Sequence, residues 1–183
     1  MTQTYVITLI LVATLSANLQ DHQTAGACRI ESKYDRFADM TTVKCEVFES
    51  GPSTARLTVQ ANASYHGKEP NETAKFWLSI SSNRGGSTRR TKPLFQEATT
   101  LYLSMDSTRL AIPVKNYSSN FYELIRSVSE SASAEIGRDD LRKLLNTKSL
   151  RGEWGGVEFT FSDAALASLR DFVSRQIFAA NDR

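Results

Sequence analysis

Side chains that could perform catalysis or bind a metal are scarce in this 183-residue chain, which has two histidines and two cysteines. The motifs of serine hydrolases, zinc proteases, P-loop enzymes, dinucleotide-binding folds and C-x-x-C redox proteins are absent from the sequence. His66 is the one imidazole outside the N-terminal region, and it follows an alternating segment where a loop should begin. We therefore expect no catalytic residue from these motifs, no metal site and no cofactor, and we interpret His66 as an exposed loop residue.

One pair of carboxylates could still act as a general acid and a general base. Gly155-Gly156 is a favoured two-residue hairpin turn, and a hairpin centred there places Glu153 opposite Glu158, on the face away from Trp154. A hydrolase-like enzyme that uses these exposed carboxylates is therefore one alternative. We favour a solvent-exposed pair whose repulsion is relieved by Arg151, because such cross-strand repulsion costs less than about 1 kcal/mol.

A second candidate site is basic. Four cations surround a Gly-Gly pair between two expected strands, namely Arg84, Arg89, Arg90 and Lys92. Guanidinium groups on such a loop suit phosphate, a sulfated sugar or an anionic lipid head group. The whole chain is nearly neutral, with 22 Lys+Arg against 20 Asp+Glu, so any such attraction is local. No aromatic residue lies among these arginines, and we expect no nucleic-acid binding. A solvated loop is the simpler interpretation, with a weak polyanion or surface binder through residues 84–92 as the alternative.

The chain begins with the features of a secretory leader. Residues 5–17 are mostly apolar and uncharged, residues 18–24 are polar, and Ala25-Gly26-Ala27 fits an A-x-A cleavage site. The apolar run is shorter than the roughly 20 residues that cross a bilayer, so we expect no membrane span. No Lys or Arg precedes the run, which leaves an uncleaved anchor or a buried N-terminal strand as alternatives. We interpret residues 1–27 as a signal peptide and 28–183 as one secreted or periplasmic domain.

Export would leave Cys28 as the first residue of the mature chain. Two cysteines in an exported chain are expected to form one disulfide, Cys28 with Cys45. Lipid attachment to Cys28, as in a lipoprotein, is the alternative, although position 25 is Ala where a Leu-like residue is usual.

The cysteines also bear on the pairing of the first two strands, for which the sequence allows two registers. A loop at 38–41 places Asp35 opposite Lys44 and separates the two cysteines too far for a bond. A turn at 36–37 instead places the cysteines directly opposite each other. The disulfide therefore favours the second register, or else a crossing between two sheets.

Hydrophobic periodicity predicts the elements that must position these residues. Alternation and turn signals predict strands at 55–65, 75–81, 99–105, 108–114, 121–129, 132–136, 150–154 and 157–161. In the hairpin around Asp106-Ser107, Leu103 should face Leu110. A short helix is expected at 139–146, and a second at 163–179 with Ser162 as its N-cap. The fold class is α+β: a sandwich-like antiparallel β-sheet of about five to eight strands, with a short helix and a C-terminal helix packed on it.

The blocks 34–43, 155–159 and 169–172 resemble small bacterial exported domains. The resemblance implies an exported, β-rich domain and brings with it no activity, cofactor or catalytic residue. Together with the leader and the missing catalytic motifs, it favours a non-catalytic exported binding or accessory domain with an envelope or extracellular partner. The identity of that partner and the oligomeric state are open at this stage.

Overall fold

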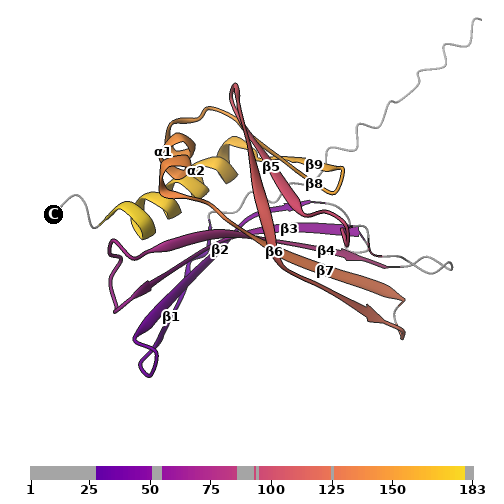
Figure 1. Cartoon of the computed structure of the whole chain (residues 1–183), viewed down its shortest axis with the longest axis horizontal. Helices are drawn as coiled ribbons and strands as arrows, with labels where there is room; N and C mark the ends of the chain where they lie inside the picture. Colours follow the sequence, from indigo (N-terminus) through magenta and orange to yellow (C-terminus); the bar gives the residue numbers. More distant parts are fainter. Residues whose placement is uncertain (1–27, 51–54, 86–92, 94, 125, 180–183) are drawn as a thin grey trace, which may run out of the picture.

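The described part of the chain is one antiparallel sheet with two helices. The computed structural model describes residues 28–50, 55–85, 93, 95–124 and 126–179. Within these residues nine strands follow the order β1-β2-β3-β4-β7-β6-β5-β8-β9 (Figure 1). The expected α+β class is confirmed, with more strands than the sequence suggested. The predicted leader, residues 1–27, lies outside the described residues.

The elements have the following bounds. The strands are β1 (Glu31–Asp35), β2 (Met40–Ser50), β3 (Ala55–His66), β4 (Lys75–Arg84), β5 (Thr100–Met105), β6 (Thr108–Tyr122), β7 (Ser127–Glu135), β8 (Leu150–Trp154) and β9 (Val157–Thr160). The helices are α1 (Arg138–Asn146) and α2 (Asp163–Val173), and α2 continues into a π-helical turn, η1 (Ser174–Phe178).

Strand β6 allows the sheet to bend because it changes partners along its length. Its first part pairs with β5, and from Val114 onward it pairs with β7. The β6–β7 register shifts between Lys115 and Ser118, and Asn116 lies there with a φ of 54°, a conformation that Asn tolerates well. The bend brings distant strands together, so that the Phe48 ring on β2 lies 5.6 Å from that of Phe159 on β9. The sheet therefore encloses a core from two sides, as a sandwich does.

Alternating side chains fill this core. On β3 the inward residues include Leu57, Val59 and Ala61, all buried, as their alternation predicted. Helix α2 begins at Ser162, whose side chain accepts a hydrogen bond from the Ala165 amide (3.2 Å). Its buried face includes Leu166, Leu169 and Phe172. The predicted N-cap and apolar stripe of this helix are confirmed.

Two predicted hairpins have the expected registers. Leu103 pairs with Leu110 across β5 and β6, and Trp154 pairs with Val157 across β8 and β9. The predicted strand at 121–129 is wrong, because β6 ends at Tyr122 and the chain turns before β7. That turn contains neither Gly nor Pro and therefore carries no turn signal of these two residue types.

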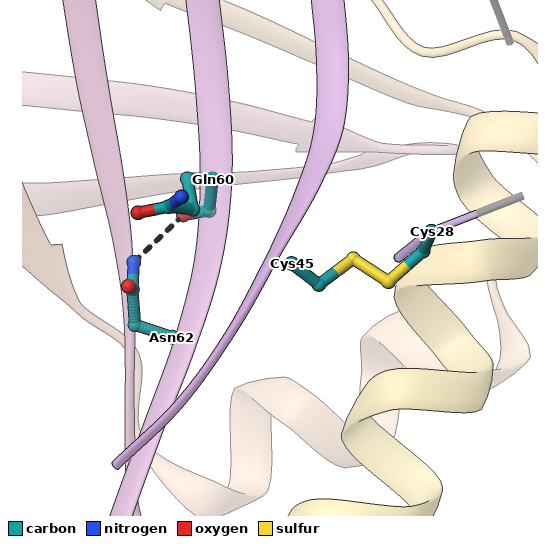
Figure 2. The surroundings of a disulfide bond; sticks show 4 residues. All are labelled: Cys28, Cys45, Gln60 and Asn62. Atoms are coloured by element: carbon teal, nitrogen blue, oxygen red, sulfur yellow. Dashed lines mark hydrogen bonds between the residues drawn. A yellow bond between two sulfur atoms is a disulfide. The ribbon is translucent and has the colours of Figure 1, made fainter. Parts of the chain in front are cut away.

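Both expected registers for the first hairpin are wrong. The Asp35 carboxylate accepts hydrogen bonds from the amides of Phe37 (2.8 Å) and Ala38 (3.3 Å), and Asp39 has a φ of 46°. These contacts form a loop at residues 36–39, so that Asp35 pairs with Met40. The predicted Cys28–Cys45 disulfide is confirmed, with the two Cα atoms 5.6 Å apart (Figure 2). It forms outside the β1–β2 ladder, because β1 begins only after Cys28, and so it does not determine the register.

The ring of Phe159 leaves no room for a side chain at Gly152, its pairing partner across β8 and β9. A Cβ atom at position 152 would lie 2.1 Å from Cζ of Phe159. We expect Gly152→Ala to lower the free energy of unfolding by about 1–3 kcal/mol through overpacking, as measured by denaturant unfolding. Gly137→Ala is the matched control, because a Cβ there meets no atom within 4 Å. Equal losses from the two variants would contradict this account.

The Asp106 carboxylate ties the β5–β6 turn to the loop before β8. It accepts hydrogen bonds from the amides of Lys148 (3.0 Å) and Ser149 (2.9 Å), and the bond from Lys148 is the largest cause that lowers the pKa of Asp106. Because the pKa of Asp106 is lower in the folded state, these bonds stabilise the fold fully above the unfolded pKa of about 4. Their contribution decreases as the pH falls through the folded-state pKa.

The denaturation midpoint of the wild type should therefore fall more steeply than that of Asp106→Asn between about pH 5 and about pH 3. The midpoints of both proteins are to be measured in urea across this range. Parallel pH profiles would show that the ionised carboxylate contributes no stability.

Candidate functional site

A buried carboxylate, that of Glu130, lies at the centre of a cluster of hydrogen-bond donors in the sheet. Glu130 is on the core face of β7, opposite Ser82 of β4, and its side chain has no exposed area. Its Oε1 accepts hydrogen bonds from the Phe95 amide (2.9 Å) and from the Tyr117 hydroxyl (2.9 Å). Its Oε2 accepts one from Nη2 of Arg84 at 3.0 Å. One side chain thus joins β4, β6, β7 and the segment before β5.

The electrostatics of this cluster favour an ionised Glu130. Removing a carboxylate from water costs several kcal/mol unless charge and hydrogen bonds compensate it. Arg84 supplies the opposite charge, and its side chain remains 22% exposed. Burial, and after it the hydrogen bond to Glu130, raises the pKa of Tyr117, so that its hydroxyl stays a donor. Because Glu130 itself is inaccessible to solvent, the cluster acts as a brace within the fold.

The segment before β5 is fixed by aromatic packing as well as by Glu130. The Phe95 ring stacks on that of Trp154, with the centroids 4.0 Å apart and the planes at 8°. Nε1 of Trp154 donates a hydrogen bond to the Ala98 carbonyl oxygen at 3.2 Å. The end of the β4–β5 connection is therefore attached to both halves of the bent sheet.

The predicted basic site falls partly outside the described residues. Arg84 is at the end of β4 and forms the ion pair with Glu130 described above. Arg89, Arg90 and Lys92 lie outside the described residues. An anion site formed by these residues stays a prediction, and the structure adds that Arg84 also has a structural partner.

The predicted carboxylate pair lies where the hairpin register placed it, with Glu153 directly opposite Glu158. Oε2 of Glu153 lies 3.0 Å from Nη2 of Arg109, on β6, and the expected Arg151 lies along the same hollow as both carboxylates. The Arg109 guanidinium also lies over the Tyr102 ring, 4.3 Å from its centroid. These groups line a shallow hollow of about 190 Å³ on the outer face of the sheet. A catalytic role for the two carboxylates stays untested.

Exposed large apolar side chains form a further feature that sequence reasoning missed. Among the described residues they are confined to two hairpins, as Ile30, Tyr34 and Phe37 of the β1–β2 hairpin and Phe121, Tyr122 and Leu124 of the β6–β7 hairpin. The two tips lie at opposite ends of the sheet (Figure 1). The second group escaped notice because its residues were assigned to a continuous strand.

The described part of the chain contains no group of three or more His, Cys, Asp and Glu side chains placed to hold a metal ion. None of its helices combines the length and the apolar composition needed to cross a bilayer.

Comparison with known proteins gives no relative: no family model, no curated protein and no solved structure matches this chain. The functional argument therefore depends on the chain's own residues.

Loss of the Glu130 carboxylate should be strongly destabilising. We expect Glu130→Gln to lower the free energy of unfolding by about 3 kcal/mol, near the lower end for a buried ion pair because Arg84 keeps some exposure. Glu135→Gln is the matched control on the same strand, because its ion pair with Lys115 is exposed and should contribute less than about 1 kcal/mol. Denaturant unfolding measures both. Similar losses in the two variants would show that Glu130 is not the brace described here.

Proposed function

We propose that this protein is an exported, non-catalytic binding domain that acts in the periplasm or outside the cell. The observation that carries the binding role is the placement of exposed large apolar side chains at two hairpin tips, Tyr34 and Phe37 at one and Phe121 and Leu124 at the other. Exposed clusters of apolar side chains are typical of interaction sites. Hairpin tips project from the sheet and are therefore well placed to contact a partner.

The disulfide supports the exported part of the proposal. Cys28 and Cys45 are bonded, and such bonds persist mainly in oxidising compartments. Cys28 directly follows the predicted cleavage site after Ala27. Strand β1 is exposed along its whole length, so the bond and the ladder to β2 together attach the start of the mature chain to the sheet.

The positions of the acidic side chains support binding over hydrolysis. Glu130 is enclosed and already accepts three hydrogen bonds, so it cannot reach a substrate from solvent. Glu153 is paired with Arg109, which offsets its charge. An exposed carboxylate held by an arginine is the arrangement expected of a solvated hairpin face.

The test of export is the intact mass of the protein released by its cells, measured before and after reduction with thiol alkylation. We expect a chain that begins at Cys28 and that gains two alkyl groups only after reduction. A bridged Cys28 sulfur has no valence left for a lipid thioether, so an added lipid mass would contradict the disulfide and make the protein a lipoprotein. A retained Met1 with two free thiols would overturn the exported assignment.

A further inference from the structure

We propose that the β6–β7 tip, defined by Phe121, Tyr122 and Leu124, inserts into the interfacial region of a lipid bilayer. The inference rests on the proposed function, since it names the partner of one of the exposed tips. It concerns peripheral attachment by side chains at a hairpin end and requires no membrane span.

The three apolar side chains at this tip are far more exposed to solvent than the apolar side chains of the core. Phe121 is 55% exposed, Tyr122 is 49% exposed and Leu124 is fully exposed. Leucine and phenylalanine each lose about 1.5–3 kcal/mol of favourable transfer energy by remaining in water. All three side chains are exposed, and none of them belongs to the hydrophobic core of the described residues.

The backbone beneath Phe121 and Tyr122 is paired within the β6–β7 ladder, so these two exposed side chains belong to a formed strand. Phe121 pairs with Val128 and Tyr122 with Ser127, and the amide of Arg126 donates to the Glu123 carbonyl oxygen at 3.2 Å. At the base of the same hairpin, Tyr117 of β6 bonds to Glu130 of β7. These backbone and side-chain hydrogen bonds therefore hold together the hairpin that carries the exposed apolar side chains.

The shape and composition of the tip favour a bilayer over a protein pocket. Figure 1 shows the β6–β7 hairpin extending to the lower right, away from the helices, with its turn at the end of the sheet. Residues 116–122 carry no charge and combine aromatic rings with hydroxyl and amide groups, while the turn after them adds one exposed acid, Glu123, and one exposed base, Arg126. Tyrosine rings and their hydroxyls are favoured at the depth of lipid head groups, where one end is apolar and the other is wet.

The turn offers one cation to a lipid surface. Arg126 is exposed there, two positions after Leu124 in sequence, together with one exposed acid, Glu123. Arg84, which pairs with Val128 across β4 and β7, has its charge offset by Glu130. A cation beside apolar side chains increases attraction to anionic head groups.

The β1–β2 tip differs in a way that makes it a useful control. Phe37 is 88% exposed, but the Arg36 guanidinium lies over its ring, 4.8 Å from the centroid. The Tyr34 hydroxyl donates to Asp39 (2.8 Å), and the Lys68 ammonium lies 5.5 Å from the Tyr34 ring centroid. Cations thus lie close to both aromatic rings of this tip and would have to be desolvated on insertion.

The experiment measures binding of the purified protein to large unilamellar vesicles by cosedimentation. One set of vesicles contains phosphatidylcholine alone, and the other contains equal parts of phosphatidylcholine and phosphatidylglycerol. The proteins are the wild type, Leu124→Ser, Phe121→Ser/Leu124→Ser and the control Phe37→Ser, all in the same processed form so that any leader contributes equally. Circular dichroism and denaturant unfolding confirm that each variant is folded, which we expect because the changed side chains are exposed.

We expect the wild type to bind both vesicle types, with tighter binding to those containing phosphatidylglycerol. The double variant should bind at least about tenfold more weakly to both, Leu124→Ser should be intermediate, and Phe37→Ser should stay within about twofold of the wild type. Raising the salt concentration should weaken the preference for phosphatidylglycerol while leaving the binding to phosphatidylcholine.

Three results would overturn the inference. The first is a wild type that binds neither vesicle, and the second is equal loss in the double variant and in Phe37→Ser. The third is a wild type that self-associates in analytical ultracentrifugation while the double variant is monomeric, because the tip would then be a protein contact. If the vesicle experiment fails but the chain is exported and disulfide-bonded, the proposed function stands. If the chain is not exported and has free thiols, the proposed function is refuted, whatever the vesicle experiment shows.

Discussion

A carboxylate inside a β-sheet is tolerated only when donors replace the water it has lost, and Glu130 obtains them from separate segments of the chain. Arg84 donates from β4, Tyr117 donates from β6, and the Phe95 amide donates from the segment before β5. Phe95 and Arg84 are 35 and 46 residues from Glu130 in sequence, and Tyr117 is 13 residues away on the same hairpin, so the full cluster forms only when the strands have assembled. The carboxylate therefore links β4, β6 and β7 at this end of the sheet.

The bend in β6 lies beside the same cluster. β6 leaves β5 and joins β7 at Val114, and Tyr117, which lies within the register shift that follows, reaches Glu130. On the other half of the sheet, the Phe95 ring stacks on Trp154. Glu130 and Trp154 thus hold one short segment between them and connect the two halves of the fold. The hairpin that carries the exposed apolar tip projects from this braced base, which links the core to the proposed interaction surface.

Elements with distinct turn chemistry could be predicted from the sequence, and elements without it could not. Gly155-Gly156 determined the β8–β9 register, and Ser162 marked the start of α2. The β6–β7 turn has no glycine or proline, so its apolar tip was interpreted as a strand. Alternation along β7 places Glu130 on the same face as Val128 and Ala132, but a charged residue is ordinarily expected to face solvent, so its burial could not be predicted. Its donors are visible only once non-local strand pairing is known.

Hydrogen exchange of the Phe95 amide is the most direct measurement of whether Glu130 holds this end of the sheet together. The amide belongs to a connecting segment, and its acceptor is the Glu130 side chain rather than a neighbouring strand. The account predicts that this amide, observed by NMR in the native protein, is protected to a degree similar to the amides of β7, because it opens only with the sheet. Exchange at the rate of an unstructured peptide would contradict the account, since the carboxylate would then not hold the segment in solution.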